Sequence, residues 1–354
     1  MLHTPQEPRN KTVPGNLINQ VINLYQKGDI PATLSQAQEL IQTYPDNPTL
    51  HNVLGACLSH TGQTKQALLH FKEALKLNPS NPAAYNNLGN ILTDLQQYEE
   101  AQKHFEYAIN IKPDFAEAHN NLGNAFKEQK DYEKAILHYE KAVNINPNYF
   151  EAYNNLGVVF NKLKNYSEAE KALKKAIQLH PEFAEAYSNL GSVFTNQKKY
   201  SQAIKYFEKA IKIDPNNAQI IGKISHIYIG KREPIKVREF AEKALEIEKK
   251  AEYYYCLSES YSLSNDLEKT AHFLKKCLSL EPNLPIGLYK YGTLFFKSGR
   301  YSDAAKSFMK SKYGDWEERY LQSLYMAESF SEYKECIKKF LNKPNISPLI
   351  QSIS

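Results

Sequence analysis

A seven-residue stretch that returns every 34 residues constrains this chain more than any other feature. Its copies begin at Ala84, Ala118, Ala152 and Ala186 and read AYNNLGN, AHNNLGN, AYNNLGV and AYSNLGS. A fixed period of this length indicates a solenoid, in which each unit buries its apolar face against its neighbours. The 354 residues are therefore predicted to form one repeat array and not several globular domains.

Each repeat is predicted to form two antiparallel helices. In the unit 116–149, His119, Leu122, Gly123 and Phe126 follow the i, i+3, i+4, i+7 spacing of one helix face. A second run with helical spacing follows, and a proline ends it because proline cannot continue the hydrogen-bonded ladder. These prolines recur at 34-residue steps, as Pro45, Pro79, Pro113, Pro147, Pro181 and Pro215.

The pattern resembles the tetratricopeptide repeat, a 34-residue helix-turn-helix. In the unit 48–81 the signature positions hold Leu54, Gly55, Leu58, Ala67, Phe71, Ala74 and Pro79. The resemblance implies an all-α fold, a right-handed α-solenoid (superhelix) of about nine to ten units. We expect a flexible leader (1–13), a superhelix over 14–342 and a tail (343–354). The expected units are 14–47, 48–81, 82–115, 116–149, 150–183, 184–217, a degenerate 218–250, 251–284, 285–316 and a terminal 317–342.

The seventh unit departs most from the pattern. Lys249 stands where a proline should end the second helix, so a longer helix through residues 239–262 is expected. The turn of this unit is the densest basic cluster of the chain. It predicts either a solvated turn or a patch for an acidic partner, formed by Lys231, Arg232, Lys236 and Arg238.

Composition narrows the classes of function. The net charge of +5 falls entirely in residues 216–354, and no arginine-rich run supports nucleic-acid binding. No apolar run approaches the length of a membrane span, and no secretory signal begins the chain. These features predict a cytoplasmic protein without nucleic-acid or membrane partners.

No catalytic signature is present, so the chain is predicted not to be an enzyme and to need no cofactor. Phosphate loops, HExxH and GxSxG are all absent from the sequence. His70, His104 and His138 share one repeat position. Contacting helices lie roughly 8–10 Å apart, so such a row does not gather three imidazoles around a zinc ion. No metal site is predicted.

The asparagines of the repeated stretch are the candidate peptide-binding residues. They lie on the first helix of each unit, which lines the concave side where this family binds partners. A carboxamide both donates and accepts hydrogen bonds, so a row of them could hold a peptide backbone without reading its side chains. A similar ladder occurs in the O-linked N-acetylglucosamine transferase family. The alternative is a structural bond to the neighbouring helix. The candidates are Asn86, Asn87, Asn90, Asn120, Asn121, Asn124, Asn154, Asn155 and Asn189.

One known specificity of the family is not expected. Chaperone-binding members hold a C-terminal carboxylate with lysines and arginines from three first helices. The matching positions here carry no cation, and Glu117, Glu151 and Glu185 would repel a carboxylate. A protein or peptide partner other than a chaperone tail is predicted, with a neutral-to-basic or extended polar segment.

Three functions remain open from the sequence. The first is a protein-interaction scaffold that binds a peptide-like segment in the groove. The second is the recognition arm of a larger enzyme, because NNLGN-rich arrays resemble those fused to glycosyltransferases, sulfotransferases or 2-oxoglutarate/Fe(II) oxygenases. The third is an assembly scaffold that oligomerises. The sequence does not give the oligomeric state.

Overall fold

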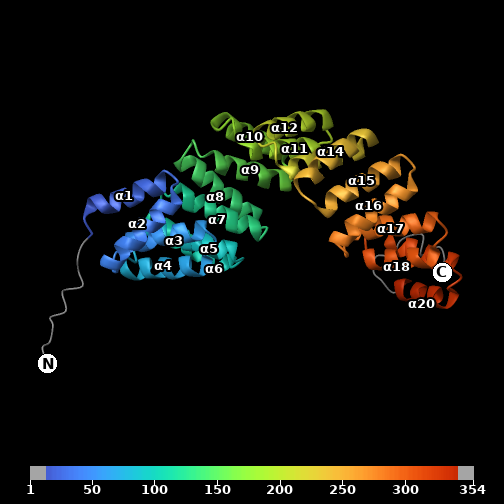
Figure 1. Ribbon diagram of the computed structural model, residues 1–354, viewed down its shortest axis with the longest axis horizontal. Coiled ribbons are helices and arrows are strands. Elements are labelled where there is room, and N and C mark those ends of the chain that lie inside the picture. The colour runs from blue at the N-terminus through green and yellow to red at the C-terminus, as the bar shows by residue number, and fades with distance from the viewer. Residues whose placement is uncertain (1–12, 342–354) are drawn as a thin grey trace, which may run out of the picture. The chain divides into compact units, whose positions relative to one another are not determined.

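The computed structural model describes residues 13–341, and in this range all helices are α-helices and no strand is present (Figure 1). The first ten helices are α1 (Gly15–Gln26), α2 (Ile30–Thr43), α3 (Pro48–His60), α4 (Thr64–Leu77), α5 (Pro82–Asp94), α6 (Tyr98–Ile111), α7 (Ala116–Glu128), α8 (Tyr132–Ile145), α9 (Phe150–Lys162) and α10 (Tyr166–Leu179). The others are α11 (Ala184–Asn196), α12 (Tyr200–Ile213), α13 (Ala218–Gly230), α14 (Pro234–Ile247), α15 (Ala251–Leu263), α16 (Leu267–Leu280), α17 (Pro285–Lys297), α18 (Tyr301–Ser311), α19 (Trp316–Met326) and α20 (Phe330–Leu341).

The predicted all-α helix-turn-helix repeat is confirmed. Each of the first nine predicted units contains one pair of helices, and in the tenth α19 starts one residue before the predicted boundary. Nearly all of the leader (1–13) and all of the tail (343–354) lie outside the described residues. No described helix is long and apolar enough to cross a membrane.

A glycine on the first helix and a large side chain on the second explain how each pair packs. A Cβ atom added to Gly123 would lie 2.7 Å from Cε1 of Tyr139, and one added to Gly157 would lie 2.4 Å from Cγ of Leu173. Tyr139 is fully buried as a result of this close approach. Gly55 meets Phe71, Gly89 meets Phe105 and Gly292 meets Phe308 in the same way.

The turn between paired helices places one residue in the left-handed region. Gly28, Gly62 and Gly299 fill it at φ near +75°, where glycine adds no steric cost. In most other units a long polar residue adopts this conformation, as Lys130 does at φ 65°. The short turn holds the second helix antiparallel to the first. Its left-handed residue therefore recurs in the repeats although the residue type varies.

The chain divides into two compact units, one up to Val193 and one from Phe194 onward. In the first unit, each helix from α1 to α10 packs on the next, and the first helices of successive repeats also touch, as α3 on α5, α5 on α7 and α7 on α9. Its central core runs from Leu58 to Ala172, with a second cluster around Val21 and Leu50 near its start. The candidate site lies where successive first helices contact each other.

The second unit contains α12 to α20, with separate apolar clusters around Tyr253, around Leu274 and around Phe308. The expected long helix through 239–262 is wrong. Helix α14 ends at Ile247 and α15 begins at Ala251, because Glu248 and Lys250 adopt extended backbone conformations with ψ of 134° and 149°. The helix therefore ends here without a proline.

Candidate protein-interaction face

A ladder of asparagine hydrogen bonds joins the first helices of the first unit. The second asparagine of each repeated pair donates from Nδ2 to an asparagine Oδ1 on the preceding first helix, 35 residues earlier. The four bonds are Asn87 to Asn52 (3.1 Å), Asn121 to Asn86 (3.0 Å), Asn155 to Asn120 (2.9 Å) and Asn189 to Asn154 (2.9 Å). The structural bond to the neighbouring helix is thus present in every repeat of the row.

The first asparagine of each pair is not on an exposed surface. Asn86, Asn120 and Asn154 retain 1%, 5% and 2% of their exposure. Asn86 and Asn154 each donate a further 3.0 Å bond to a glutamate of the following first helix, Glu117 and Glu185. Buried carboxamides need such partners, since an unpaired one costs free energy. These three residues therefore supply structure, and the expectation that they face the groove needs correction on this point.

The second asparagine of each pair is half-buried and keeps unused hydrogen-bonding capacity. Asn87 and Asn155 each donate one of their two amide hydrogens, and among the described residues nothing donates to their Oδ1 atoms. Asn121 accepts a 3.4 Å bond from Asn120 at its Oδ1. We name the row Asn87, Asn121, Asn155 and Asn189 the ladder face.

The third candidate position lies beside this row. Asn90 and Asn124 are both half-buried. Asn124 accepts a 2.7 Å bond from the hydroxyl of Tyr139, whose pKa is raised by burial and, to a smaller extent, by Glu128. Phe105 occupies the equivalent position opposite Asn90 and has no hydroxyl to donate. Asn124 is thus oriented by its own repeat.

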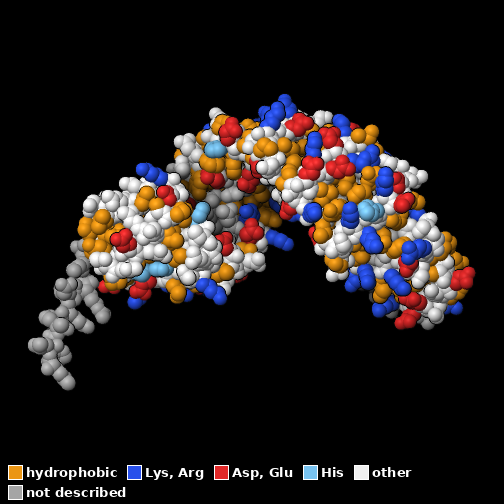
Figure 2. Space-filling model, in the orientation of Figure 1, with side chains coloured by type: hydrophobic (Ala, Val, Ile, Leu, Met, Phe, Trp, Pro, Cys, Tyr) orange, Lys and Arg blue, Asp and Glu red, His pale blue; other side chains and the backbone are white. Residues whose placement is uncertain are grey.

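The predicted basic patch lies at the turn before α14 and on the first residues of that helix, and most of its charges already have partners. Glu233 binds Lys231 at 2.7 Å and Lys236 at 3.7 Å. Both lysines also lie over the ring of Tyr228, within 5.2 Å of its centroid. Arg238 donates a 2.9 Å bond to Ser260. In Figure 2, basic and acidic side chains are interspersed over the second unit.

Two members of the histidine row pair with a histidine of the preceding helix. Nδ1 of His70 lies 3.0 Å from Nδ1 of His51, and Nδ1 of His138 lies 3.2 Å from Nδ1 of His119. Burial, the nearby His119 and Lys141 lower the pKa of His138 to about 4. Sequence reasoning missed these pairs, although the histidines 19 residues apart recur 68 residues later.

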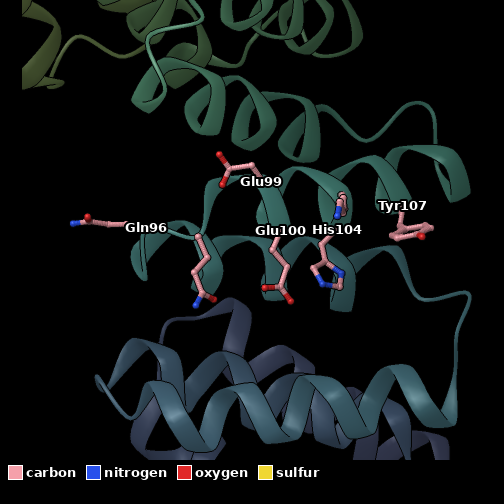
Figure 3. A pocket seen from close by; sticks show the side chains of 7 residues that line it. Gln96, Glu99, Glu100, His104 and Tyr107 are labelled. Carbon is pink, nitrogen blue, oxygen red and sulfur yellow. The ribbon is translucent and has the colours of Figure 1, made fainter.

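His104, the third member of the row, stacks on Tyr85 at a centroid distance of 5.8 Å. Its Nδ1 is buried and has no partner among the described residues. It lines an open surface pocket with Gln96, Gln97, Glu99, Glu100, Lys103 and Tyr107. In Figure 3, Glu100 and His104 point to one side of α6 and Glu99 to the other. Because this pocket is lined by both acidic and basic side chains from one segment, its charge does not indicate a particular class of ligand.

In the second unit, charged pairs join neighbouring first helices. Nε2 of His226 on α13 lies 2.9 Å from Oε1 of Glu252 and 3.6 Å from Sγ of Cys256, both on α15. Lys290 on α17 binds Glu259 on α15 at 2.9 Å. Among the described residues, no group of three or more His, Cys, Asp or Glu is arranged to hold a metal ion.

The stacked helix pairs define a helical repeat scaffold. The TPR repeat signature matches residues 60–95, 89–130 and 123–164, and the tetratricopeptide repeat signature matches 150–183, 184–217 and 251–284. These ranges cover more than half of the sequence. The chain belongs to the tetratricopeptide repeat family, a family of protein-interaction scaffolds.

Two solved structures have a fold similar to that of this chain. PilF of Pseudomonas aeruginosa is 24% identical, with a TM-score of 0.53 over 61% of this chain and 97% of its own. The APC/C hetero-tetramer Cut9–Hcn1 gives 17% identity and a TM-score of 0.60 over 77% of this chain and 54% of the matched chain. No curated protein matches the sequence significantly.

Proposed function

We propose that the ladder face of the first unit binds an extended segment of a partner protein through its main chain. The observation that carries this proposal is the unused capacity of Asn87 and Asn155, whose carboxamides are held in place by one bond each. A fixed carboxamide can accept from a peptide N–H and donate to a peptide C=O. Because the row is already ordered, binding does not incur the entropy of fixing these side chains.

The spacing of the row sets the register of such a segment. First helices in contact lie roughly 8–10 Å apart, and an extended chain advances about 3.3 Å per residue. Successive asparagines would therefore meet about every third residue of the segment. This predicts a sequence-tolerant site that reads backbone length and extension more than side chains.

The charge next to the row favours one class of segment. Glu117, Glu151 and Glu185 lie on the same helices, and two of them accept bonds from the buried asparagines. Two carboxylates held close to a bound segment repel acidic side chains and attract basic ones. A neutral-to-basic segment is therefore proposed, and a free C-terminal carboxylate is not.

The test uses peptides selected from a random phage-displayed library against the full chain. Their affinities are then measured by fluorescence anisotropy for the wild type and for Asn87→Ala/Asn121→Ala/Asn155→Ala. Loss of binding is expected in this triple variant. The matched control is Asn110→Ala/Asn144→Ala, two exposed asparagines of second helices. Selected peptides that bind the triple variant and the wild type equally would refute the proposal.

Backbone recognition itself is tested with the peptides. N-methylation removes one main-chain donor at a time, so methyl groups at about every third residue should weaken binding while those between should not. The roles as an enzyme's recognition arm and as an oligomerising scaffold stay proposals. Light scattering across concentrations tests the second of them.

A further inference from the structure

His51 and His70 present two ring nitrogens to each other at the distance that a shared metal ion requires. Their Nδ1 atoms lie 3.0 Å apart, and their ring centroids lie 5.2 Å apart. With metal–nitrogen bonds of about 2.0–2.1 Å, this separation corresponds to an N–metal–N angle of roughly 95°. Such an angle suits adjacent ligands in a tetragonal copper(II) or nickel(II) site.

The backbone prepares one of the two imidazoles for this role. Nε2 of His51 lies 2.8 Å from the carbonyl oxygen of Pro45. A carbonyl only accepts, so Nε2 of His51 carries the proton and Nδ1 keeps its lone pair. Metal-binding histidines commonly have such a bond from the far nitrogen to a carbonyl. Burial and the nearby His51 also lower the pKa of His70, which favours the neutral form of this imidazole.

A second pair with the same geometry offers an internal comparison. His119 and His138 lie 3.2 Å apart at Nδ1, and His119 also bonds to the carbonyl of Pro113. Two differences separate the pairs. His119 is only 5% exposed, whereas His51 and His70 are both half-buried. Three residues after His70 stands Glu73, whereas three residues after His138 stands Lys141.

The charges of these two neighbours act in opposite directions. The pKa of Glu73 is lowered mainly by its bond to Lys76, and in smaller part by His51. Lys141 lowers the pKa of both His119 and His138, after the larger effect of burial. A nearby carboxylate favours a bound cation, and an ammonium group opposes it.

We propose that His51 and His70 form a two-imidazole site for a divalent transition-metal ion of the copper or nickel class. The remaining coordination positions would be filled by water, since no third ligand side chain lies close enough among the described residues. In the present arrangement His70 donates from Nδ1 to His51. On metal binding this proton moves to Nε2 of His70, so that both Nδ1 lone pairs face the ion and no net proton is released. The pair His119 and His138 remains unoccupied.

The test is a calorimetric titration of the full chain with Ni²⁺ at pH 7, in a His3→Ala background. That substitution removes the imidazole of His3, which would compete with His51 and His70 for nickel. One bound ion per chain is expected, together with paramagnetic broadening of the ring signals of His51 and His70. Mg²⁺, which prefers oxygen ligands, should not bind.

Three variants make the assignment specific. His70→Gln should abolish saturable binding, and His138→Gln should leave it unchanged. Glu73→Lys keeps both imidazoles and should weaken binding tenfold or more, which guards against misfolding as the cause. Absent binding, binding that survives His70→Gln, or equal loss in His138→Gln would overturn the proposal. Unchanged affinity in Glu73→Lys would overturn the claim that the charge of Glu73 makes the ion bind at His51 and His70 and not at His119 and His138.

Discussion

Asn121 on α7 donates a 3.0 Å hydrogen bond to Asn86 on α5, and Asn86 donates in turn to Glu117 at the start of α7. The buried carboxamide therefore ties two consecutive repeats together through both of its polar atoms. The two asparagines of each pair have different roles. The buried one joins the repeats, and the half-buried one lies at the surface between them.

Replacing a buried asparagine of the ladder should destabilise the protein more than replacing its half-buried neighbour. Asn86→Ala leaves Asn121 and Glu117 without their partner, which should cost about 1–3 kcal/mol. Asn87→Ala loses one partly solvated bond and should cost less than about 1 kcal/mol. Urea unfolding followed by circular dichroism measures both. Equal costs would contradict the division of roles.

A methyl group on a packing glycine should also destabilise the fold. In Gly123→Ala the new Cβ would lie 2.7 Å from the buried ring of Tyr139, and such overpacking costs typically about 1–3 kcal/mol. Gly230→Ala is the matched control, since its Cβ would meet nothing closer than 3.9 Å. Thermal melting should show a lower midpoint for the first variant and an unchanged or higher one for the second.

The histidine pairs predict a loss of stability in mild acid. His138 takes up a proton near pH 6.5 when unfolded but only near pH 4 when folded, because burial and its neighbours oppose the charge. Between these values the unfolded state holds more protons, so stability falls as the pH drops. Allowing for partial exposure, the loss should be about 1–2 kcal/mol.

The variant His138→Phe isolates this contribution. It removes the titrating group and keeps an aromatic ring beside Phe126, against which His138 stacks at 5.6 Å. Urea midpoints at pH 7 and pH 4.5 should differ less in this variant than in the wild type. An unchanged pH dependence would show that the loss arises elsewhere.

His226 in the second unit should titrate in the opposite sense. Burial lowers its pKa, but the bonds to Cys256 and Glu252 outweigh that effect and raise it to about 10. The pair stabilises the fold fully below pH 6.5 and loses this effect as the pH rises toward the folded pKa. Its side chains are 41% and 49% exposed, so the gain should stay under about 1 kcal/mol.

Nuclear magnetic resonance of the imidazole protons measures this pKa directly. The wild-type midpoint should lie above 6.5, and Glu252→Gln should bring it down by removing the negative partner. A wild-type midpoint at or below 6.5 would mean that burial outweighs the two bonds.

The repeat period allowed the two helices of each unit to be predicted, because turns and helix ends depend on local signals. The turn residues, the prolines and the glycine at Gly123 all recur at one spacing. Where a signal was missing, the expectation failed. The break between α14 and α15 occurs without a proline, because the backbone at Glu248 and Lys250 is extended.

The site could be predicted only in outline. The sequence identified the asparagines but did not separate buried Asn86 from half-buried Asn87, because adjacent residues on a helix differ by only 100° in direction. Which one faces the next repeat depends on how the units stack. The histidine pairs were missed for a related reason, since His51 and His70 meet across two helices.

The ladder also bears on how the binding face could be lengthened or shortened. Each rung links one repeat to its nearest neighbour only, so fraying at one end removes rungs singly and leaves the others intact. In the proposed binding mode, the number of consecutive asparagine-bearing repeats sets the length of the bound segment. Duplicating residues 116–149 would add one asparagine bond to the row, and the proposed binding mode then predicts a bound segment about three residues longer.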